Sequence, residues 1–213
     1  MFQKSFGTSG VNAIGSFQLS QLNSSSVKSK LKAAGINTNS KQYKAAVKQM
    51  MSAGNGAMYG NIQGIKNLMS HYDKDGDYIN PVNGLAGLLV TDDNENSRRR
   101  IISIPDSSKE EMYELTKKEF LRENGVCNGD TTKRTDVYNN LYRKMSKKDR
   151  LAAGYTLEKY ERIYRQAFYD AAKKADPNWE IGKPIKAGAL DDVTRETAET
   201  GKSPAQATLD TKI

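Results

Sequence analysis

The chain has 213 residues, a formal net charge of +8 and a hydrophobic share of 37%. This length suffices for one full core, and the low hydrophobic share predicts that part of the chain lies outside it. Cys127 and His71 are the only cysteine and histidine, which excludes a disulfide framework and a thiolate or multi-histidine metal cluster within one chain. No segment reaches the roughly 18 apolar residues that a membrane span needs.

Residues 1–26 are rich in serine, glycine, asparagine and glutamine, a composition that predicts a flexible N-terminal arm. Apolar residues spaced along this arm leave open that it becomes ordered on a partner. The first residues lack the apolar core of a signal peptide. We therefore expect a cytoplasmic protein, with signal-independent export as the alternative.

Residues 27–185 show a helical periodicity of apolar side chains, which predicts a mainly α fold with a single domain of five to seven helices. Glycine, proline and capping residues mark the expected helix ends. Late in this region, Gly154 is expected to end a short helix and Thr156 to cap the last long one. Residues 186–213 contain few apolar side chains and predict a disordered tail.

Two short apolar runs, residues 84–90 and 101–104, enclose the polar segment 91–97. This pattern predicts a small β-hairpin, the only sheet expected in the chain. A lone hairpin is marginally stable, so it should pack against the helices.

Three carboxylates at alternating positions, Asp73, Asp75 and Asp77, precede this hairpin. Calcium prefers six to eight oxygen ligands, and a loop with carboxylates at positions 1, 3 and 5 supplies three of them. Position 7 contributes a backbone carbonyl in such loops, and here that residue is Ile79. The spacing therefore predicts a calcium-binding loop.

Two departures from the calcium-loop pattern narrow this prediction. Position 6 is Tyr78 where a glycine is usual, and position 12 is Gly84 where a bidentate glutamate is usual. A paired calcium-sensor motif is therefore not expected. The site would instead take its missing ligand from Asp92, Asp93 or Glu95, if the hairpin folds back onto the loop.

Two alternatives to calcium stay open for this loop. Aspartates accept backbone N–H groups in turns and Gly76 permits a positive φ, so the loop is equally explained as a metal-free turn. A transition-metal site formed by His71 with Asp73 and Asp75 is the other alternative, although carboxylates suit hard ions better.

The segment Arg98-Arg99-Arg100 is a candidate surface for nucleic acid or an acidic partner, because guanidinium groups bind phosphates. The alternative is a solvated surface, since no nucleic-acid-binding signature accompanies the arginines. Tyr155 and Tyr169 lie off the clearest apolar stripe of their helix. They are candidate protein-interface residues, because tyrosine combines a large ring with a polar tip.

Catalytic groupings are scarce in the sequence. Cys127 and His71 are the sole candidates for a thiol–imidazole pair and lie in different predicted loops. No G-x-S-x-G elbow is present, although paired-acid hydrolysis stays open because carboxylates are abundant. An enzyme of unrecognised type is therefore a third hypothesis, behind the two binding hypotheses.

The segments YDKDGDYINP (72–81), ISIP (102–105) and LAAGY (151–155) resemble an uncharacterised family of Gram-positive bacterial proteins. The resemblance spans roughly Gly35 to Ile185. It implies a bacterial origin and a shared fold, and it brings no catalytic residues. We thus expect a non-enzymatic interaction or structural protein with one calcium loop and a protein partner; the alternative is a nucleic-acid-binding protein.

Overall fold

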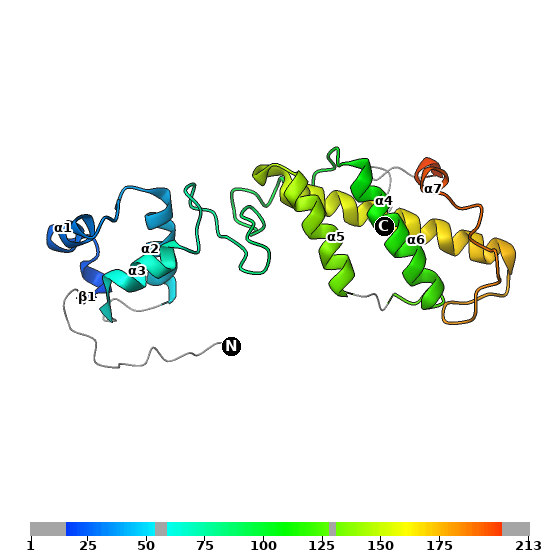
Figure 1. Cartoon of the computed structure of the whole chain (residues 1–213), viewed down its shortest axis with the longest axis horizontal. Coiled ribbons are helices and arrows are strands. Elements are labelled where there is room, and N and C mark those ends of the chain that lie inside the picture. The colour runs from blue at the N-terminus through cyan, green and yellow to red at the C-terminus, as the bar shows by residue number, and fades with distance from the viewer. Residues whose placement is uncertain (1–15, 54–58, 128–130, 202–213) are drawn as a thin grey trace. The chain divides into compact units, whose positions relative to one another are not determined.

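The computed structural model describes residues 16–53, 59–127 and 131–201. The chain divides into two compact units, residues 1–81 and 82–213. The predicted mainly α fold is confirmed, because the described residues form seven α-helices and one two-stranded ladder (Figure 1). The division differs from the single domain expected from the sequence. Its physical reason is that residues 82–101 bury only Ala86, so no continuous core runs through that segment.

The first unit is built from three helices and a minimal strand pair. Strand β1 (Phe17–Gln18) pairs antiparallel with β2 (Tyr59–Gly60), with Phe17 opposite Gly60. The helices are α1 (Ser25–Ala33), α2 (Lys41–Ala53) and α3 (Ile62–Met69). Their shared core consists of Phe17, Leu19, Leu22, Val27, Leu31, Ile36, Tyr43 and Ile65.

The prediction of a flexible arm is therefore wrong for residues 16–26. Phe17, Leu19 and Leu22 are 4%, 3% and 2% exposed, so the second part of the expected arm belongs to the core. The Ser24 hydroxyl accepts the Val27 N–H at 3.3 Å and caps α1. Residues 1–15 of the expected arm lie outside the described residues.

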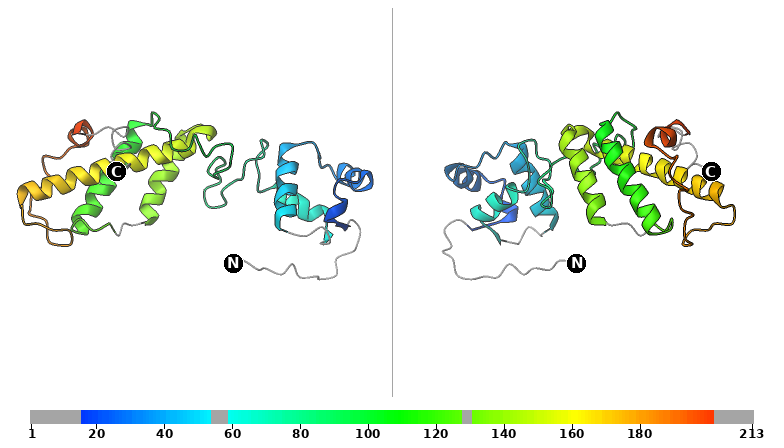
Figure 2. Two further views of the ribbon diagram at one scale, coloured as in Figure 1. Left: turned by 180° about the vertical axis from the view of Figure 1, so that it is seen from behind. Right: turned by 45° about the vertical axis from the view of Figure 1, so that its right-hand side comes forward.

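The second unit is a bundle in which α4 (Asp106–Arg122) and α5 (Thr131–Lys144) pack against α6 (Arg150–Ala175). Figure 1 and Figure 2 show α4 and α5 side by side, both crossing the long helix α6 at an angle. Aromatic rings fill the space between α4 and α6: Tyr113 contacts Tyr164 with ring centroids 5.4 Å apart, and Phe120 contacts Phe168 at 5.7 Å. A short 3-10 helix, η2 (Lys147–Asp149), leads directly into α6.

The start of α6 corrects two expectations. Gly154 and Thr156 do not separate two helices but lie inside one continuous helix of 26 residues. Gly154 is required there because a Cβ would come within 2.6 Å of the Tyr142 hydroxyl. Thr156 does not cap; its hydroxyl donates to the Ala152 carbonyl at 2.8 Å and accepts the Ile102 N–H at 3.1 Å.

The predicted β-hairpin over residues 85–104 is absent from that fully described segment, which forms turns and irregular backbone instead. Gly84 and Gly87 adopt φ values of +71° and +80°, which are incompatible with an extended strand. Ile102 uses its N–H on α6 instead of on a neighbouring strand. The chain's small ladder is the β1–β2 pair, far from the predicted position.

The prediction of a disordered tail is wrong for residues 186–201. Leu190 and Ala198 are 2% and 5% exposed and belong to the core of the second unit. Helix α7 (Arg195–Gly201) is tied to α4 by Arg195, which lies 2.8 Å from Glu110, and to α6 by Glu199, which accepts the Tyr164 hydroxyl at 2.7 Å. Residues 202–213 of the expected tail lie outside the described residues.

Four ionised side chains form a buried cluster that joins α4, α5 and α6, here named the four-charge cluster. Glu119 of α4 is 1% exposed and lies 2.6 Å from Arg134 of α5 and 3.1 Å from Arg165 of α6. Glu161 of α6 completes it, at 2.9 Å from Arg134 and 3.1 Å from Arg165. The negative charges of the two carboxylates equal the positive charges of the two guanidiniums, so the cluster carries no net charge.

We predict that Glu119→Ala lowers the free energy of unfolding of the second unit by about 3 kcal/mol, because it leaves two largely buried guanidiniums with a single shared carboxylate, Glu161. Glu114→Ala, on an exposed position of the same helix, should change it by less than about 0.5 kcal/mol. Urea denaturation followed by circular dichroism measures both. Equal losses for the two variants would contradict a stabilising role of the cluster.

Candidate functional site

The acidic loop is a tight hairpin-like turn between two bridged tyrosines. Tyr72 and Tyr78 form an antiparallel bridge, and their rings meet edge-on with centroids 5.9 Å apart. Inside the bridge, the Asp73 N–H donates to the Asp77 carbonyl at 2.9 Å, and the Gly76 N–H donates to the Asp73 carbonyl at 3.0 Å. Gly76 has a φ of +86°. A glycine in the left-handed region after a turn is the usual way to close a three-residue hairpin loop.

The loop is anchored to α2 by side-chain and backbone contacts within the first unit. The Gln42 amide donates to the carbonyls of Met69 and Tyr72 at 2.9 and 2.8 Å, which satisfies the end of α3. The Tyr72 hydroxyl donates to Gln49 at 2.8 Å. A Cβ on Gly76 would lie 3.0 Å from the Lys41 carbonyl oxygen, so the turn lies directly against the start of α2.

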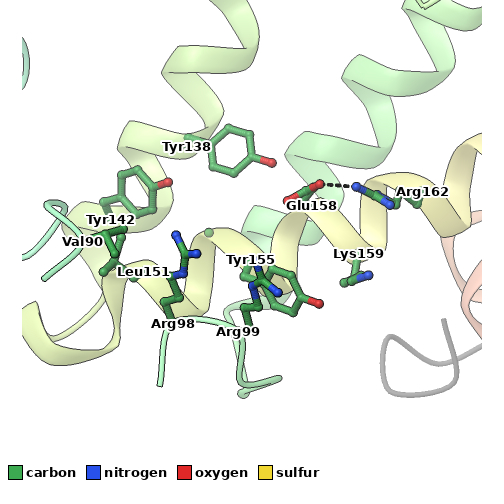
Figure 3. Close-up of a pocket in the computed structure, with 11 residues that line it drawn as sticks. Val90, Arg98, Arg99, Tyr138, Tyr142, Leu151, Tyr155, Glu158, Lys159 and Arg162 are labelled. Atoms are coloured by element: carbon green, nitrogen blue, oxygen red, sulfur yellow. Dashed lines mark hydrogen bonds and ion pairs between the residues drawn. The ribbon is translucent and has the colours of Figure 1, made fainter. Parts of the chain in front are cut away.

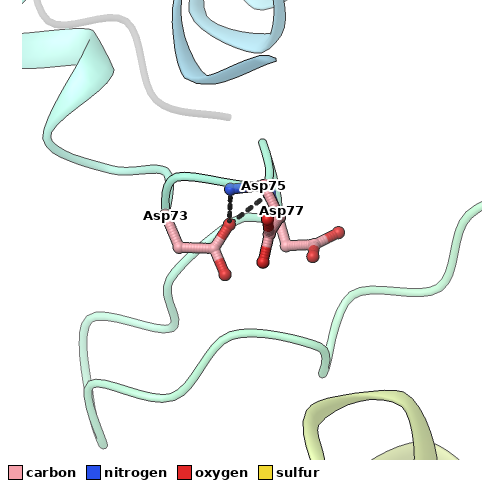
Figure 4. A group of neighbouring side chains, drawn as sticks. All are labelled: Asp73, Asp75 and Asp77. Atoms are coloured by element: carbon pink, nitrogen blue, oxygen red, sulfur yellow. Dashed lines mark hydrogen bonds between the residues drawn. The ribbon is translucent and has the colours of Figure 1, made fainter. Parts of the chain in front are cut away.

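The three aspartate side chains converge within this turn (Figure 4). Each offers one carboxylate oxygen such that all three oxygens lie within 4.8 Å of one another. Two oxygens at calcium distance from one ion are at most about 4.6–5.2 Å apart, so this spacing fits a shared ion. The Asp73 side chain also stabilises the turn, because its Oδ1 accepts the N–H groups of Asp75 and Asp77, both at 2.9 Å.

The other predicted metal ligands are not members of this carboxylate group. Asp92 and Asp93 belong to the second unit, in a run of turns at residues 92–99. Ile79 donates its N–H to the His71 carbonyl at 2.8 Å, which closes the base of the loop. His71 is exposed and lies outside the group of candidate ligands that the described residues form.

A second candidate site is a groove of about 600 Å³ in the second unit, here named the tyrosine groove. Side chains from α5, from α6 and from the segment before α4 line it (Figure 3). They combine cations with tyrosine rings: Val90, Arg98, Arg99, Tyr138, Tyr142, Leu151, Gly154, Tyr155, Glu158, Lys159 and Arg162.

The cations that line the groove differ in whether they have a close ion-pair partner. Arg162 forms an ion pair with Glu158 one helical turn earlier. Arg98 has a single long contact, 3.4 Å from Glu95, and its buried Nε has no hydrogen-bond partner among the described residues. Lys159 is 4% exposed, and its Nζ lies 5.1 Å from the centroid of the Tyr155 ring.

Two tyrosines of the groove, Tyr138 and Tyr142, have a raised pKa and stay protonated in the physiological range. Burial raises the pKa of Tyr138, and the nearby carboxylates of Glu161 and Glu158 raise it further. Burial followed by the influence of Glu158 raises the pKa of Tyr142. Both hydroxyls are therefore available as hydrogen-bond donors.

The structure separates some predicted binding residues and unites others. Arg98, Arg99 and Tyr155 share the groove, whereas Arg100 is turned to Asp149 at 3.7 Å and to the Ser97 carbonyl at 3.2 Å. Tyr169 packs edge-on against Trp179, with centroids 5.7 Å apart, so part of its ring is used within the chain.

Sequence analysis did not identify Tyr138, Tyr142, Lys159 or Arg162 as site residues. One signal was present: Tyr155, Lys159 and Arg162 are four and three residues apart and so share a helix face. Nothing in the spacing indicated that this face meets Tyr138 and Tyr142 of α5.

Among the described residues, no helix combines the length and apolar character required to cross a membrane. Fold and sites together define a helical protein with a candidate cation-binding loop and a basic groove. The chain belongs to the family described as "Domain of unknown function (DUF3879)", whose model matches residues 36–213. No curated protein and no solved structure matches the chain.

We predict that Gly76→Ala destabilises the first unit by roughly 2 kcal/mol or more, because it combines a left-handed backbone with a contact on the Lys41 carbonyl. Gly35→Ala is the matched control: Gly35 has a φ of +80° and nothing within 4 Å of an added Cβ. It should cost about 1 kcal/mol. Thermal denaturation compares the two variants, and equal losses would show that the loop does not press on α2.

Proposed function

We propose that the protein is a non-enzymatic bacterial interaction protein whose acidic loop binds one calcium ion. The observation that carries the proposal is the convergence of the Asp73, Asp75 and Asp77 oxygens within 4.8 Å. Calcium accepts six to eight oxygens in flexible geometry, so backbone carbonyls such as that of Ile79 and water would complete its shell.

The anchoring of the loop indicates what an ion would do there. The turn leads from the end of α3 and is fastened to α2 by Gln42 and Tyr72. An ion held by three aspartates would neutralise their mutual repulsion and stiffen this corner of the first unit. A stiffened corner lowers the entropic cost of binding a partner on that surface.

The turn's hydrogen bonds are also those of a metal-free loop, so a direct measurement must decide. The non-enzymatic part is supported by the sequence, in which no recognised catalytic motif accompanies the single cysteine and the single histidine. The bacterial part is supported by the family resemblance described from the sequence.

We predict that calcium raises the melting temperature of the protein and that Asp75→Asn abolishes this shift. Asp75 is exposed, and the N–H groups of Asp75 and Asp77 both donate to Asp73 Oδ1, so the variant removes ligand charge and keeps the acceptor of these two bonds. At free calcium of 100 times Kd the expected stabilisation is about 2.7 kcal/mol. Isothermal titration calorimetry and thermal denaturation measure the effect.

Asp136→Asn is the charge-matched control, because Asp136 is exposed on α5 and is not a member of the acidic loop. It should leave the calcium response intact. Absence of calcium heat in the wild-type protein, together with a melting temperature that a chelator does not change, would refute the metal proposal.

A second candidate function is nucleic-acid binding through the basic segment Arg98–Arg100. One observation favours it: Arg98 and Arg99 line a groove with two further cations instead of forming close ion pairs. Phosphate contacts of this kind supply most non-specific affinity for nucleic acid.

For this second candidate, we expect a mobility shift with an oligonucleotide at low salt that disappears as salt rises, because binding releases counterions. Arg99→Gln should lower the slope of log affinity against log salt by about 1. Lys118→Gln, on an exposed position of α4, should not change it. No complex at low salt would eliminate this candidate.

A further inference from the structure

The tyrosine groove holds more positive charge than the protein neutralises. Four cations line it, and the single lining carboxylate, Glu158, is engaged by Arg162. Arg99 and Lys159 have no ion pair among the described residues, and Arg98 has only its 3.4 Å contact with Glu95, so these three residues supply the groove's excess charge. An unbalanced group of cations in a concave, partly apolar surface is a feature of anion-binding sites.

Lys159 is the most informative of these cations. Lysine is almost never fully buried unless it is paired, yet this residue is 4% exposed. Among the described residues its one interaction is the 5.1 Å approach of Nζ to the Tyr155 ring. Its stem is buried in α6 packing while its ammonium lines the groove, which places a positive charge where a ligand would lie.

Arg98 provides an independent indication. Its guanidinium lies in the groove with five N–H donors, of which one contacts Glu95 at the long distance of 3.4 Å. Its Nε is buried and has no acceptor within the described part of the chain. Leaving a buried donor of a charged group unsatisfied is unfavourable, and an oxyanion would satisfy it with the paired geometry that guanidinium prefers.

The remaining lining favours a ligand with a ring. Tyr138 and Tyr142 have ring centroids 6.0 Å apart, and Leu151 and Val90 add apolar surface. A groove of about 600 Å³ lies within the size range of small-molecule sites and is much larger than a bare phosphate needs. The tyrosine hydroxyls offer neutral donors beside the cations (Figure 3).

We propose that the tyrosine groove binds a phosphate group attached to a planar ring, the chemistry of a nucleotide. Arg98 and Lys159 would hold the phosphate, and the tyrosine rings would contact the base. The source is either a free nucleotide or a nucleotide unit of a single strand. This inference deepens the second candidate function and is independent of the calcium loop.

The test measures binding of four probes to the full chain at low salt: inorganic phosphate, AMP, a fluorescein-labelled oligothymidylate and a polyglutamate peptide. Arg98→Gln and Lys159→Met should each weaken AMP or oligothymidylate binding by about tenfold or more, since each removes a charge-assisted contact. Lys159→Met keeps an apolar side chain of similar length in the buried part of α6. Arg98→Gln lies outside the helices and therefore still tests the proposal if Lys159→Met folds poorly. Arg143→Gln, which removes an exposed charge of α5 outside the groove, should change affinity by less than about twofold.

Tighter binding of AMP than of phosphate supports the proposal and indicates a free nucleotide. Oligothymidylate bound more tightly than AMP, with the same loss in the two groove variants, also supports it and indicates a strand. Polyglutamate bound as tightly as the nucleotide probes, phosphate bound as tightly as AMP, or an equal effect of Arg143→Gln would overturn it.

Two results separate this inference from the second candidate function. Oligonucleotide binding that is insensitive to both groove variants refutes the groove and leaves nucleic-acid binding intact. AMP binding without oligonucleotide binding refutes the nucleic-acid function and leaves the groove intact. Asp75→Asn should not alter any of these affinities, which keeps the calcium proposal separate.

Discussion

The four-charge cluster is the interaction on which the second unit depends. A carboxylate that is 1% exposed would be strongly unfavourable alone, and Glu119 is tolerated because two guanidiniums from different helices reach it. Apolar contacts would allow α5 to slide or rotate, whereas short, directional ion pairs allow little of either. Arg134 lies one turn before Tyr138 and two turns before Tyr142, so the same pairs orient the groove-facing side of α5.

The two units are stabilised by different kinds of interaction. The first unit closes its acidic turn with backbone hydrogen bonds, a left-handed glycine and a glutamine that serves two carbonyls. The second unit relies on a bundle of aromatic rings around a neutral charge cluster. The consequence is that hydrogen bonds within the chain close the turn, while the groove keeps a buried Arg98 Nε that has no acceptor among the described residues.

Errors in the sequence interpretation share one cause. In the sequence, Gly154 is a plausible helix end and Thr156 a plausible helix N-cap. In the structure, the absence of a side chain at Gly154 leaves room for the Tyr142 ring, and the Thr156 hydroxyl accepts the N–H of Ile102 in the segment before α4. Phe17 and Leu190 sit in polar stretches that predict disorder, and both are buried. In each case a partner distant in the sequence overrode the local preference, which is where pattern-based assignment is weakest.

The sequence by itself determined the helical character, most helix positions and the turn at Asp73–Asp77, because periodicity, capping and turn chemistry act over a few residues. It also identified Arg98, Arg99 and Tyr155 as binding candidates. Only the tertiary structure decided the division into two units, the pairing of Glu119 with α5 and α6, and the union of those three residues with Lys159 and the α5 tyrosines. Periodicity identifies the face of a helix, and the choice of which faces meet depends on long-range packing.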